Sequence, residues 1–527
     1  ASFKTILFIA GIGIFIGASL SNGMMDIARH GIYQPEHFYF AEIMCILLAV
    51  MLTDVVLLDV FNSMGMPTST TVSLVFELLG GTFALSLIKV NNDATLALGD
   101  LINTDKALSV IMAIFVSVAI AFFFGMLVQW LARIVFTFNY TKNIKYSIGL
   151  FGGIAATSII YFMLIKGLKD SSFMTPENKQ WIQDNTLLLI ASFFVFFTAL
   201  MQVLHWLKVN VFKVVVLMGT FALALAFAGN DLVNFVGVPV AGYDSYMMAR
   251  ASGDAAMTMG GLATDASANI LLLLAAGAIM IVTLWTSRRA LSVSKTELSL
   301  SNQNEGEERY GSSVVSRGLV RAAMNVNAFY ERIMPARLQR AVAARFEKLP
   351  EEEREGGSYD LIRATVNLTT ASILISIATS LKLPLSTTYV CFMVSMGSSL
   401  ADRAWGRESA VYRITGVLTV VSGWFVTGFG AFTIAFLVGL TLMYGGNAAV
   451  LIVSALCGWM LVRSNRRKNR AAVAETQRPA ASRAKDTEGV IEECIAEVCY
   501  TMGQVTRIYD RTLIAVFKEN RKVLREM

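Results

Sequence analysis

The stretch Pro384-Leu385-Ser386-Thr387-Thr388 has a close copy earlier in the chain, Pro67-Thr68-Ser69-Thr70-Thr71. A second polar element precedes each copy: Asn22-Gly23-Met24-Met25-Asp26 before the first, and Gly229-Asn230-Asp231-Leu232-Val233-Asn234 before the second. All four elements lie in strongly apolar sequence, where polar side chains are costly to bury. Two matched pairs in the same order therefore predict one binding site built from two related halves of the chain.

Composition indicates a membrane protein. Of the 527 residues, 55% are hydrophobic and 16% are charged, whereas a soluble domain has about 25% charged residues. Apolar runs such as residues 187–207 are long enough to cross a bilayer as a helix, which takes roughly 17–25 residues. We therefore predict an all-α polytopic membrane protein. Residues 3–20 lead directly into the first polar element, so they belong to the fold and not to a cleaved signal.

Polarity divides the chain into four parts. Basic clusters at residues 288–289 and 463–470 put the linker and tail on the cytoplasmic side, since positive residues favour that side. The predicted parts are residues 1–287, a first transmembrane region with the first repeat and the start of the second; residues 288–360, a polar linker that is partly helical; residues 361–463, a second transmembrane region that completes the second repeat; and residues 464–527, a helical tail with a possible regulatory role.

The chemistry of the four elements favours an oxyanion together with a cation. Pro suits a helix start and Ser or Thr caps it, so each Pro-x-Ser-Thr-Thr predicts a helix N-terminus with free amides and hydroxyls, which binds anions. Asn230 and Asn234 lie four positions apart, on one helical face. Gly229 permits a break in the helix that would free backbone groups to coordinate a solute. The anion-binding candidates are Asn22, Asp26, Ser69, Thr70, Thr71, Asn230, Asp231, Asn234, Ser386, Thr387 and Thr388.

Nearby oxygen ligands predict a cation next to the anion. The candidates for Na⁺ are Asp26, Asp231, Asn22 and Asn230. Phosphate at neutral pH keeps a P–OH donor that sulfate lacks, and an ionised Asp only accepts hydrogen bonds, so Asp26 or Asp231 would select phosphate. Glu77 is a candidate for the transport pathway; the alternative is a carboxylate that faces the bundle or the interface.

The function predicted from these elements is cation-coupled oxyanion transport by alternating access. An anion channel is an alternative of another class, although duplicated elements with buried carboxylates favour a transporter. We predict that the protein is not an enzyme, because the sequence has no His-Glu-x-x-His, Gly-x-Ser-x-Gly or Walker motif and only three histidines.

These residues resemble a known family, the inorganic phosphate transporter (PiT) family. Residues 229–234 are similar to its Gly-Ala-Asn-Asp-x-x-Asn signature, and both Pro-x-Ser-Thr-Thr elements are similar to its Pro-x-Ser-Thr-Thr-His loops. Trp424 and Thr427 resemble its Trp-x-x-Thr. The resemblance implies an inverted-repeat transporter with two re-entrant helical hairpins and broken helices at mid-membrane, which imports phosphate with Na⁺ or H⁺ as coupling ion and no cofactor. Because the family also includes sulfate transporters, sulfate or another oxyanion is the alternative substrate.

Two departures from the family pattern concern the cation. When Asn22 is aligned with Asn230, Gly23 takes the place of Asp231 and the carboxylate moves to Asp26, close to one helical turn away. Val72 and Tyr389 replace the His that often follows Ser-Thr-Thr in the family.

The expected setting of the protein completes these predictions. Some bacterial relatives carry a helical PhoU-like region, which residues 464–527 loosely resemble; a helix along the inner leaflet is the alternative for this tail. We expect a bacterial inner-membrane protein that contacts phosphate and membrane lipid, forms a homodimer and does not bind nucleic acid.

Overall fold

A computed structural model describes most of the chain. The described residues are 2–21, 25–64, 68–138, 140–162, 175–254, 257–263, 269–286, 335–347, 360–403 apart from 382 and 384, and 409–476, with scattered residues between 301 and 332 and between 498 and 509. They divide into two compact units, residues 1–451 and 452–527. Within them the structure is helical, with two isolated β-bridges and no strand.

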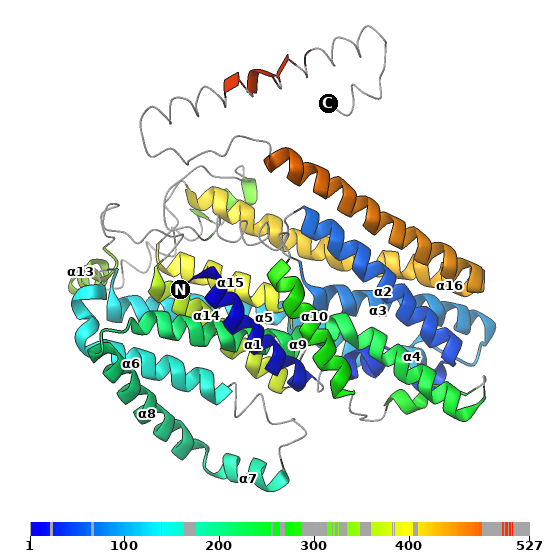
Figure 1. The fold of residues 1–527 in the computed structure, drawn as a ribbon, viewed down its shortest axis with the longest axis horizontal. Coiled ribbons are helices and arrows are strands. Elements are labelled where there is room, and N and C mark those ends of the chain that lie inside the picture. The colour runs from blue at the N-terminus through cyan, green and yellow to red at the C-terminus, as the bar shows by residue number, and fades with distance from the viewer. Residues whose placement is uncertain are drawn as a thin grey trace. The chain divides into compact units, whose positions relative to one another are not determined.

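The described helices follow one another along nearly the whole chain. In the first part they are α1 (Phe3–Leu20), the π-helix η2 (Ile27–Gly31), η3 (Pro35–His37), α2 (Phe40–Ser63), α3 (Thr70–Asn92), α4 (Leu98–Leu101), α5 (Thr104–Phe136), α6 (Tyr140–Ile160), α7 (Pro176–Asp184) and α8 (Thr186–Trp206). The later elements are α9 (Val211–Ser252), η5 (Gly260–Ala263), α10 (Ile270–Thr286), α13 (Ala336–Arg345), α14 (Leu361–Ser380), α15 (Thr387–Ala401) and α16 (Ser409–Thr476). Figure 1 shows the course of these helices.

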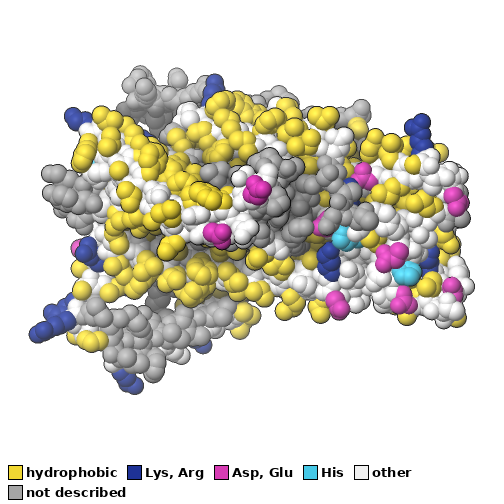
Figure 2. All heavy atoms as spheres, turned by 90° about the horizontal axis from the view of Figure 1, so that it is seen from below, with side chains coloured by type: hydrophobic (Ala, Val, Ile, Leu, Met, Phe, Trp, Pro, Cys, Tyr) yellow, Lys and Arg dark blue, Asp and Glu magenta, His cyan; other side chains and the backbone are white. Residues whose placement is uncertain are grey.

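Seven of the described helices are long and apolar enough to cross a membrane: α2, α3, α5, α8, α9, α14 and the part of α16 from residue 410 to 464. Large apolar side chains lie on their outer surfaces; Leu187 of α8, for example, is 82% exposed. In Figure 2 hydrophobic side chains cover broad areas of the visible face, and most of the acidic and histidine side chains seen on this face gather toward one end. Apolar surface of this extent suits a lipid environment, and it confirms the prediction of an all-α polytopic membrane protein.

Glycines bring three pairs of helices into backbone contact. A Cβ atom at Gly17 of α1 would lie 2.3 Å from the backbone oxygen of Leu225 in α9. One at Gly80 of α3 would lie 2.2 Å from the Phe432 oxygen in α16, and one at Gly397 of α15 would lie 2.2 Å from the Phe122 oxygen in α5. Small residues permit such close approach, which membrane helices use because water drives no association there. Each contact joins a helix from before residue 140 to one from after residue 210.

A buried ion network connects α5 with the start of α14 and the end of α15. Arg133 of α5 holds Asp402 through two hydrogen bonds, from Nε at 2.7 Å and from Nη2 at 2.8 Å. Its Nη1 lies 2.7 Å from Asp360 Oδ2, at the N-cap of α14, and Gln129 Nε2 donates to Asp402 at 2.6 Å. The side chains of Arg133 and Asp402 are completely buried. A bidentate, fully hydrogen-bonded pair of this kind fixes the relative position of the helices that it joins.

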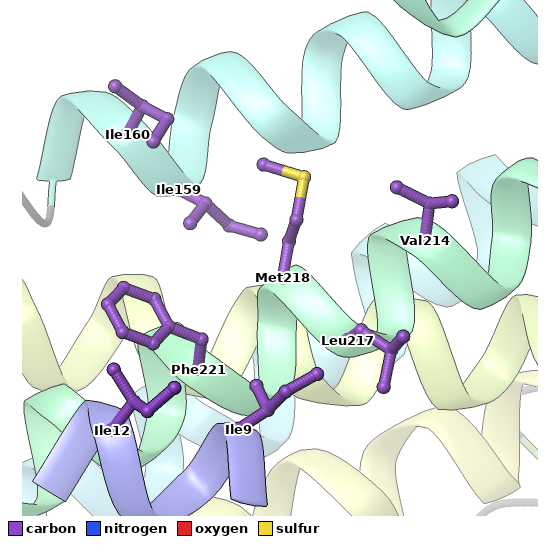
Figure 3. Close-up of a pocket in the computed structure, with 8 residues that line it drawn as sticks. All are labelled: Ile9, Ile12, Ile159, Ile160, Val214, Leu217, Met218 and Phe221. Atoms are coloured by element: carbon purple, nitrogen blue, oxygen red, sulfur yellow. The ribbon is translucent and has the colours of Figure 1, made fainter. Parts of the chain in front are cut away.

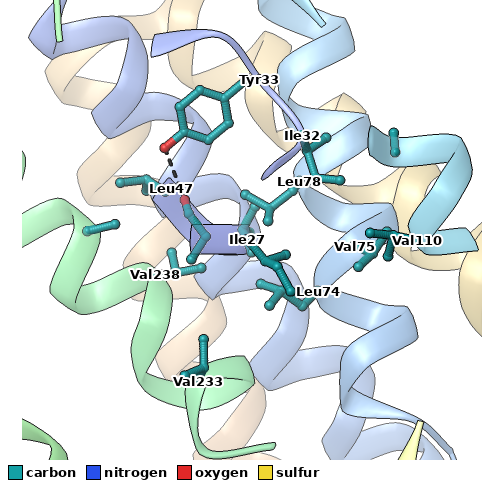
Figure 4. Packing of buried hydrophobic residues seen from close by; sticks show 14 of the residues in the cluster. Ile27, Ile32, Tyr33, Leu47, Leu74, Val75, Leu78, Val110, Val233 and Val238 are labelled. Atoms are coloured by element: carbon teal, nitrogen blue, oxygen red, sulfur yellow. Dashed lines mark hydrogen bonds between the residues drawn. The ribbon is translucent and has the colours of Figure 1, made fainter. Parts of the chain in front are cut away.

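The first polar element lies where the chain leaves α1. Helix α1 ends at Leu20, and the π-helix η2 follows at Ile27. The Tyr33 hydroxyl donates to the Ala28 carbonyl over 3.1 Å, which secures η2 in the apolar core against α2, α3 and α9 (Figure 4). Residues 22–24 of this element lie outside the described residues, so the broken helix expected here stays a prediction.

The second polar element does not interrupt its helix. Helix α9 runs continuously from Val211 to Ser252, so the break expected at Gly229 is wrong. Glycine permits a break without requiring one, and a continuous helix satisfies its own backbone groups, as hydrocarbon surroundings demand. The site must therefore use the side chains of α9 and not its backbone.

Candidate functional site

Two helix N-termini carry the repeated hydroxyl elements. The Ser69 hydroxyl accepts a hydrogen bond from the Val72 amide at 3.1 Å, and the Ser386 hydroxyl accepts one from the Tyr389 amide at 3.2 Å. Each Ser is the N-cap of its helix, so α3 starts at Thr70 and α15 at Thr387.

The N-terminus of α3 reaches the chain just before α15. Thr71 donates from its hydroxyl to the Leu385 carbonyl at 3.0 Å, and Asn230 Nδ2 of α9 donates to the same oxygen at 2.9 Å. Asn234, one turn further along α9, donates from Nδ2 to Thr71 at 2.9 Å and to Thr70 at 3.1 Å. The two repeated elements and the Asn-Asp-x-x-Asn element therefore meet at one place, which we call the Leu385 cluster: Thr70, Thr71, Asn230, Asp231, Asn234, Leu385 and Thr387.

Asp231 connects the cluster to α15. Its carboxylate accepts hydrogen bonds from the Thr387 hydroxyl and, over 2.7 Å, from Asn230 Nδ2. Asp231 is 2% exposed and Asn230 is 1% exposed. The Asn230 amide oxygen has no hydrogen-bond partner among the described residues. A carboxylate and a free amide oxygen are hard ligands for a cation, and they lie beside two positive helix N-termini that favour an anion.

The remaining candidate residues are Asp26, Thr388 and Asn22. Asp26 precedes η2, with its carboxylate 3.8 Å from His30 Nε2. The η2 helix lies against α9 just beyond Asn234, since a Cβ atom at Gly237 would be 3.0 Å from the Ala28 Cβ. Thr388 is partly buried in the first turn of α15. Asn22, Pro67 and Pro384 lie outside the described residues.

Glu77 lies further along α3 than the cluster. It is completely buried, and its Oε1 accepts a hydrogen bond from the Ser73 hydroxyl at 2.7 Å. Glu77 is thus enclosed by the helix bundle, and its expected place in the transport pathway stays a prediction.

Several contacts at the site carry no sequence signal of their own. The Leu385 carbonyl accepts two hydrogen bonds, but every residue has such a group. Arg29, 2% exposed, pairs with Asp244 of α9. Thr68 donates to Thr427 at 3.2 Å; each residue belongs to a noted motif, but nothing in the sequence pairs the two.

Tyr389 stands where the sequence comparison with the family led us to look for a His, directly after the second Ser-Thr-Thr element. Its ring stacks on Trp424 with 3.6 Å between ring centroids and 15° between planes. An apolar residue and a stacked aromatic ring thus follow the two Ser-Thr-Thr elements, so these positions supply packing and no imidazole.

A hollow away from the Leu385 cluster is unsuited to an anion. It has a volume of about 360 Å³ and lies between α1, α6 and α9 (Figure 3). All eight lining residues are apolar: Ile9, Ile12, Ile159, Ile160, Val214, Leu217, Met218 and Phe221. Because these side chains offer no hydrogen-bond donor, the hollow cannot compensate an oxyanion for its lost hydration.

The apolar helices and the buried polar cluster define a helical membrane protein of the transporter class. Residues 1–295 match the model of the Phosphate transporter family. The chain therefore belongs to that family: it is an integral membrane protein that transports phosphate. The resemblance noted in its motifs is confirmed at the level of the family.

One solved structure has a related fold. It is described as the sodium-dependent phosphate transporter, and it superimposes with a TM-score of 0.55 over 83% of this chain and 89% of its own, at 16% sequence identity. At this identity the likeness shows the fold alone. No curated protein matches the sequence.

Proposed function

We propose that this protein imports inorganic phosphate in symport with Na⁺ or H⁺, and that the N-termini of α3 and α15 hold the phosphate. The observation that carries the proposal is the meeting of both Ser-Thr-Thr elements with α9 at the Leu385 carbonyl. The Thr70, Thr71 and Thr387 hydroxyls and the first-turn amides form the anion site. Ser69 and Ser386 set its geometry as N-caps, and Thr388 of α15 belongs to the same donor set.

Binding in this site is an exchange of hydrogen bonds. The Thr71 and Thr387 hydroxyls now donate to Leu385 and Asp231. When a phosphate oxygen accepts the hydrogen bond from one of these hydroxyls, the Leu385 carbonyl or the Asp231 carboxylate loses it. Release of these contacts separates the α3 end from the α15 end, which supplies a local basis for alternating access.

Asp231 has two roles in this proposal. Its carboxylate accepts the P–OH hydrogen of phosphate, which sulfate does not have at neutral pH, and so it selects against sulfate. With Asn230, and with Asn22 and Asp26 from the chain after α1, it also supplies oxygen ligands for the coupling cation. The buried Asn230 amide oxygen, which has no partner within the described part of the chain, supports this assignment.

Cross-packing of the two halves supports an inverted repeat with re-entrant hairpins. The helix after the first Ser-Thr-Thr element, α3, lies against α16, whereas the helix after the second, α15, lies against α5. This reciprocal arrangement is the one expected when two related halves interlock. We further propose that the protein is a homodimer in a bacterial inner membrane, with the linker and tail in the cytoplasm.

Proteoliposomes test the proposal. Radiolabelled phosphate uptake is measured under separately imposed Na⁺ and proton gradients, with unlabelled sulfate as competitor. Uptake that one gradient drives and sulfate does not inhibit identifies the coupling ion and supports symport. In D231N, uptake should fall and sulfate should compete. Transport and selectivity equal to wild type in both D26N and D231N would contradict the proposed carboxylate role.

The same preparation distinguishes a channel. Planar bilayers containing the purified protein should show no unitary phosphate currents, since alternating access moves one substrate load per cycle. Discrete single-channel currents would overturn the symport mechanism.

A further inference from the structure

A second buried polar cluster lies between α2 and α3, and the proposed phosphate site does not use it. The Ser73 hydroxyl donates to Glu77 Oε1 at 2.7 Å, and Asp54 of the neighbouring helix α2 lies close enough to both side chains to interact with them electrostatically. Ser73 and Glu77 are completely buried. One hydroxyl and two carboxyl groups therefore lie together inside the hydrophobic bundle.

The cluster has too few hydrogen-bond donors for two ionised carboxylates. A Ser hydroxyl has one hydrogen, and Ser73 gives it to Glu77. It therefore has no second hydrogen to give to an ionised Asp54. Two neighbouring carboxylates in a low-dielectric interior also repel, so both stay ionised only with a cation between them. The pair requires a proton or a metal cation.

The adjoining helices offer no basic side chain for this purpose. The one Lys or Arg on α2 and α3 is Lys89, and its ammonium group lies 2.8 Å from Glu42 Oε2. Helix α16, which touches α3 at Gly80, has no charged residue from 414 to 462. The other helices packed on α3 carry charged residues that are bound elsewhere or lie near helix ends: Asp100, Asp105, Lys106, Arg133, Lys213, Asp231, Asp244 and Arg250.

Oxygen atoms of the cluster are available to a ligand. Glu77 Oε2 and Asp54 Oδ1 are buried and have no hydrogen-bond partner among the described residues. The hydroxyl of Thr53, next to Asp54 in the chain and 1% exposed, has none either. Unpartnered buried oxygens are costly, whereas hard oxygen ligands of this kind bind hard cations, and a carboxylate also accepts a proton.

We propose that Asp54, Ser73 and Glu77 form a buried site for one monovalent cation, Na⁺ or a proton, separate from the cation ligands proposed at Asp231. The transport role of this site rests on the proposed function. Glu77 lies seven positions after Thr70 on α3, about 10 Å along the helix axis. A cation held there attracts an oxyanion at the helix N-terminus through a low-dielectric interior, so its binding favours phosphate binding.

Cation binding by the purified full-length protein tests the site without any transport measurement. Equilibrium binding of radioactive Na⁺ and potentiometric proton uptake are compared between wild type, E77Q, D54N and the control D59N, which removes another carboxylate from α2. We expect E77Q and D54N to lower the affinity for one cation at least tenfold and D59N to leave it unchanged. Whichever of the two titrations changes identifies the ion.

Unchanged Na⁺ binding and proton uptake in both E77Q and D54N overturn the proposal. If E77Q does not fold, S73A provides a second variant, because loss of the Ser73 hydroxyl should also lower the affinity. If E77Q loses the bound cation but the wild-type protein shows no phosphate uptake, the cation site stands and the proposed function is refuted. If the wild-type protein takes up phosphate but E77Q and D54N bind both cations as wild type does, the site alone is refuted.

Discussion

The Thr71 hydroxyl donates to the carbonyl of Leu385, a residue 314 positions further along the chain. This hydrogen bond joins the first Ser-Thr-Thr element to the second. It also places a donor of α3 beside the N-cap of α15, so that both helix N-termini point into the same polar cluster.

The first prediction concerns this hydroxyl. T71V keeps the shape of the side chain and removes its donor, so phosphate uptake should fall about 10- to 100-fold, in line with about 1.5–3 kcal/mol for a hydrogen bond to a charged group. T71S should retain most activity. Uptake by the purified variants in proteoliposomes gives the comparison, and a T71V protein with wild-type uptake would remove Thr71 from the anion site.

The second prediction concerns the buried ion network. D402N leaves the Arg133 guanidinium without its bidentate partner, and breaking a buried pair from one side costs about 3–5 kcal/mol. The thermal unfolding temperature in detergent should fall markedly. Asp105 lies exposed in the first turn of α5, so D105N is the matched control and should unfold like wild type. Equal unfolding temperatures for D402N and D105N would show that the network contributes little.

The third prediction tests the glycine contact between α3 and α16. G80A puts a methyl group against the Phe432 carbonyl, where the available distance is 2.2 Å, and overpacking of this kind costs about 1–3 kcal/mol. A methyl group at Gly458 would meet nothing within 4 Å among the described residues. G458A should therefore be neutral or slightly stabilising, because Ala favours helix over Gly. Unfolding temperatures measure both variants, and a G80A protein as stable as G458A would contradict the tight contact.

The fourth prediction separates the two parts of Tyr389. Its buried hydroxyl has no hydrogen-bond partner among the described residues, whereas its ring stacks on Trp424. Y389F should therefore keep stability and uptake at or above the wild-type level. W424A should lose about 3–5 kcal/mol of stability, while F425A, at a residue that is 58% exposed, should lose much less. A strong defect in Y389F would reveal a role for the hydroxyl.

Much of the fold was predictable from the sequence because its signals are local. Apolar length identified spans such as α8, and Ser before Thr-Thr identified the caps of α3 and α15. The polar positions of the Leu385 cluster were predictable because buried polar groups stand out in apolar sequence. Their pairing partners were not: Leu385 acts through its backbone, and the Ser73 contact with Asp54 needs two helices to be placed side by side.

The expected break at Gly229 shows a second limit. Local sequence shows where a helix can break. A break also leaves backbone groups without hydrogen bonds in the bilayer, which is costly, and α9 stays continuous. Helix α1, in contrast, ends just before the similar Asn22-Gly23 pair. Sequence alone does not tell whether a helix continues through such an element.

The distance along the chain between Thr71 and Leu385 also sets a schedule for biogenesis. Ribosomes add roughly 5–20 residues per second, so the 314 positions between these residues correspond to a delay on the order of 15–60 s. During that interval the first half of the chain already exists, but the Leu385 carbonyl that will accept the hydrogen bond from Thr71 has not yet been made. The insertion machinery must therefore shelter an incomplete polar site, and a ribosome that stalls before residue 385 leaves in the membrane a chain unable to close it.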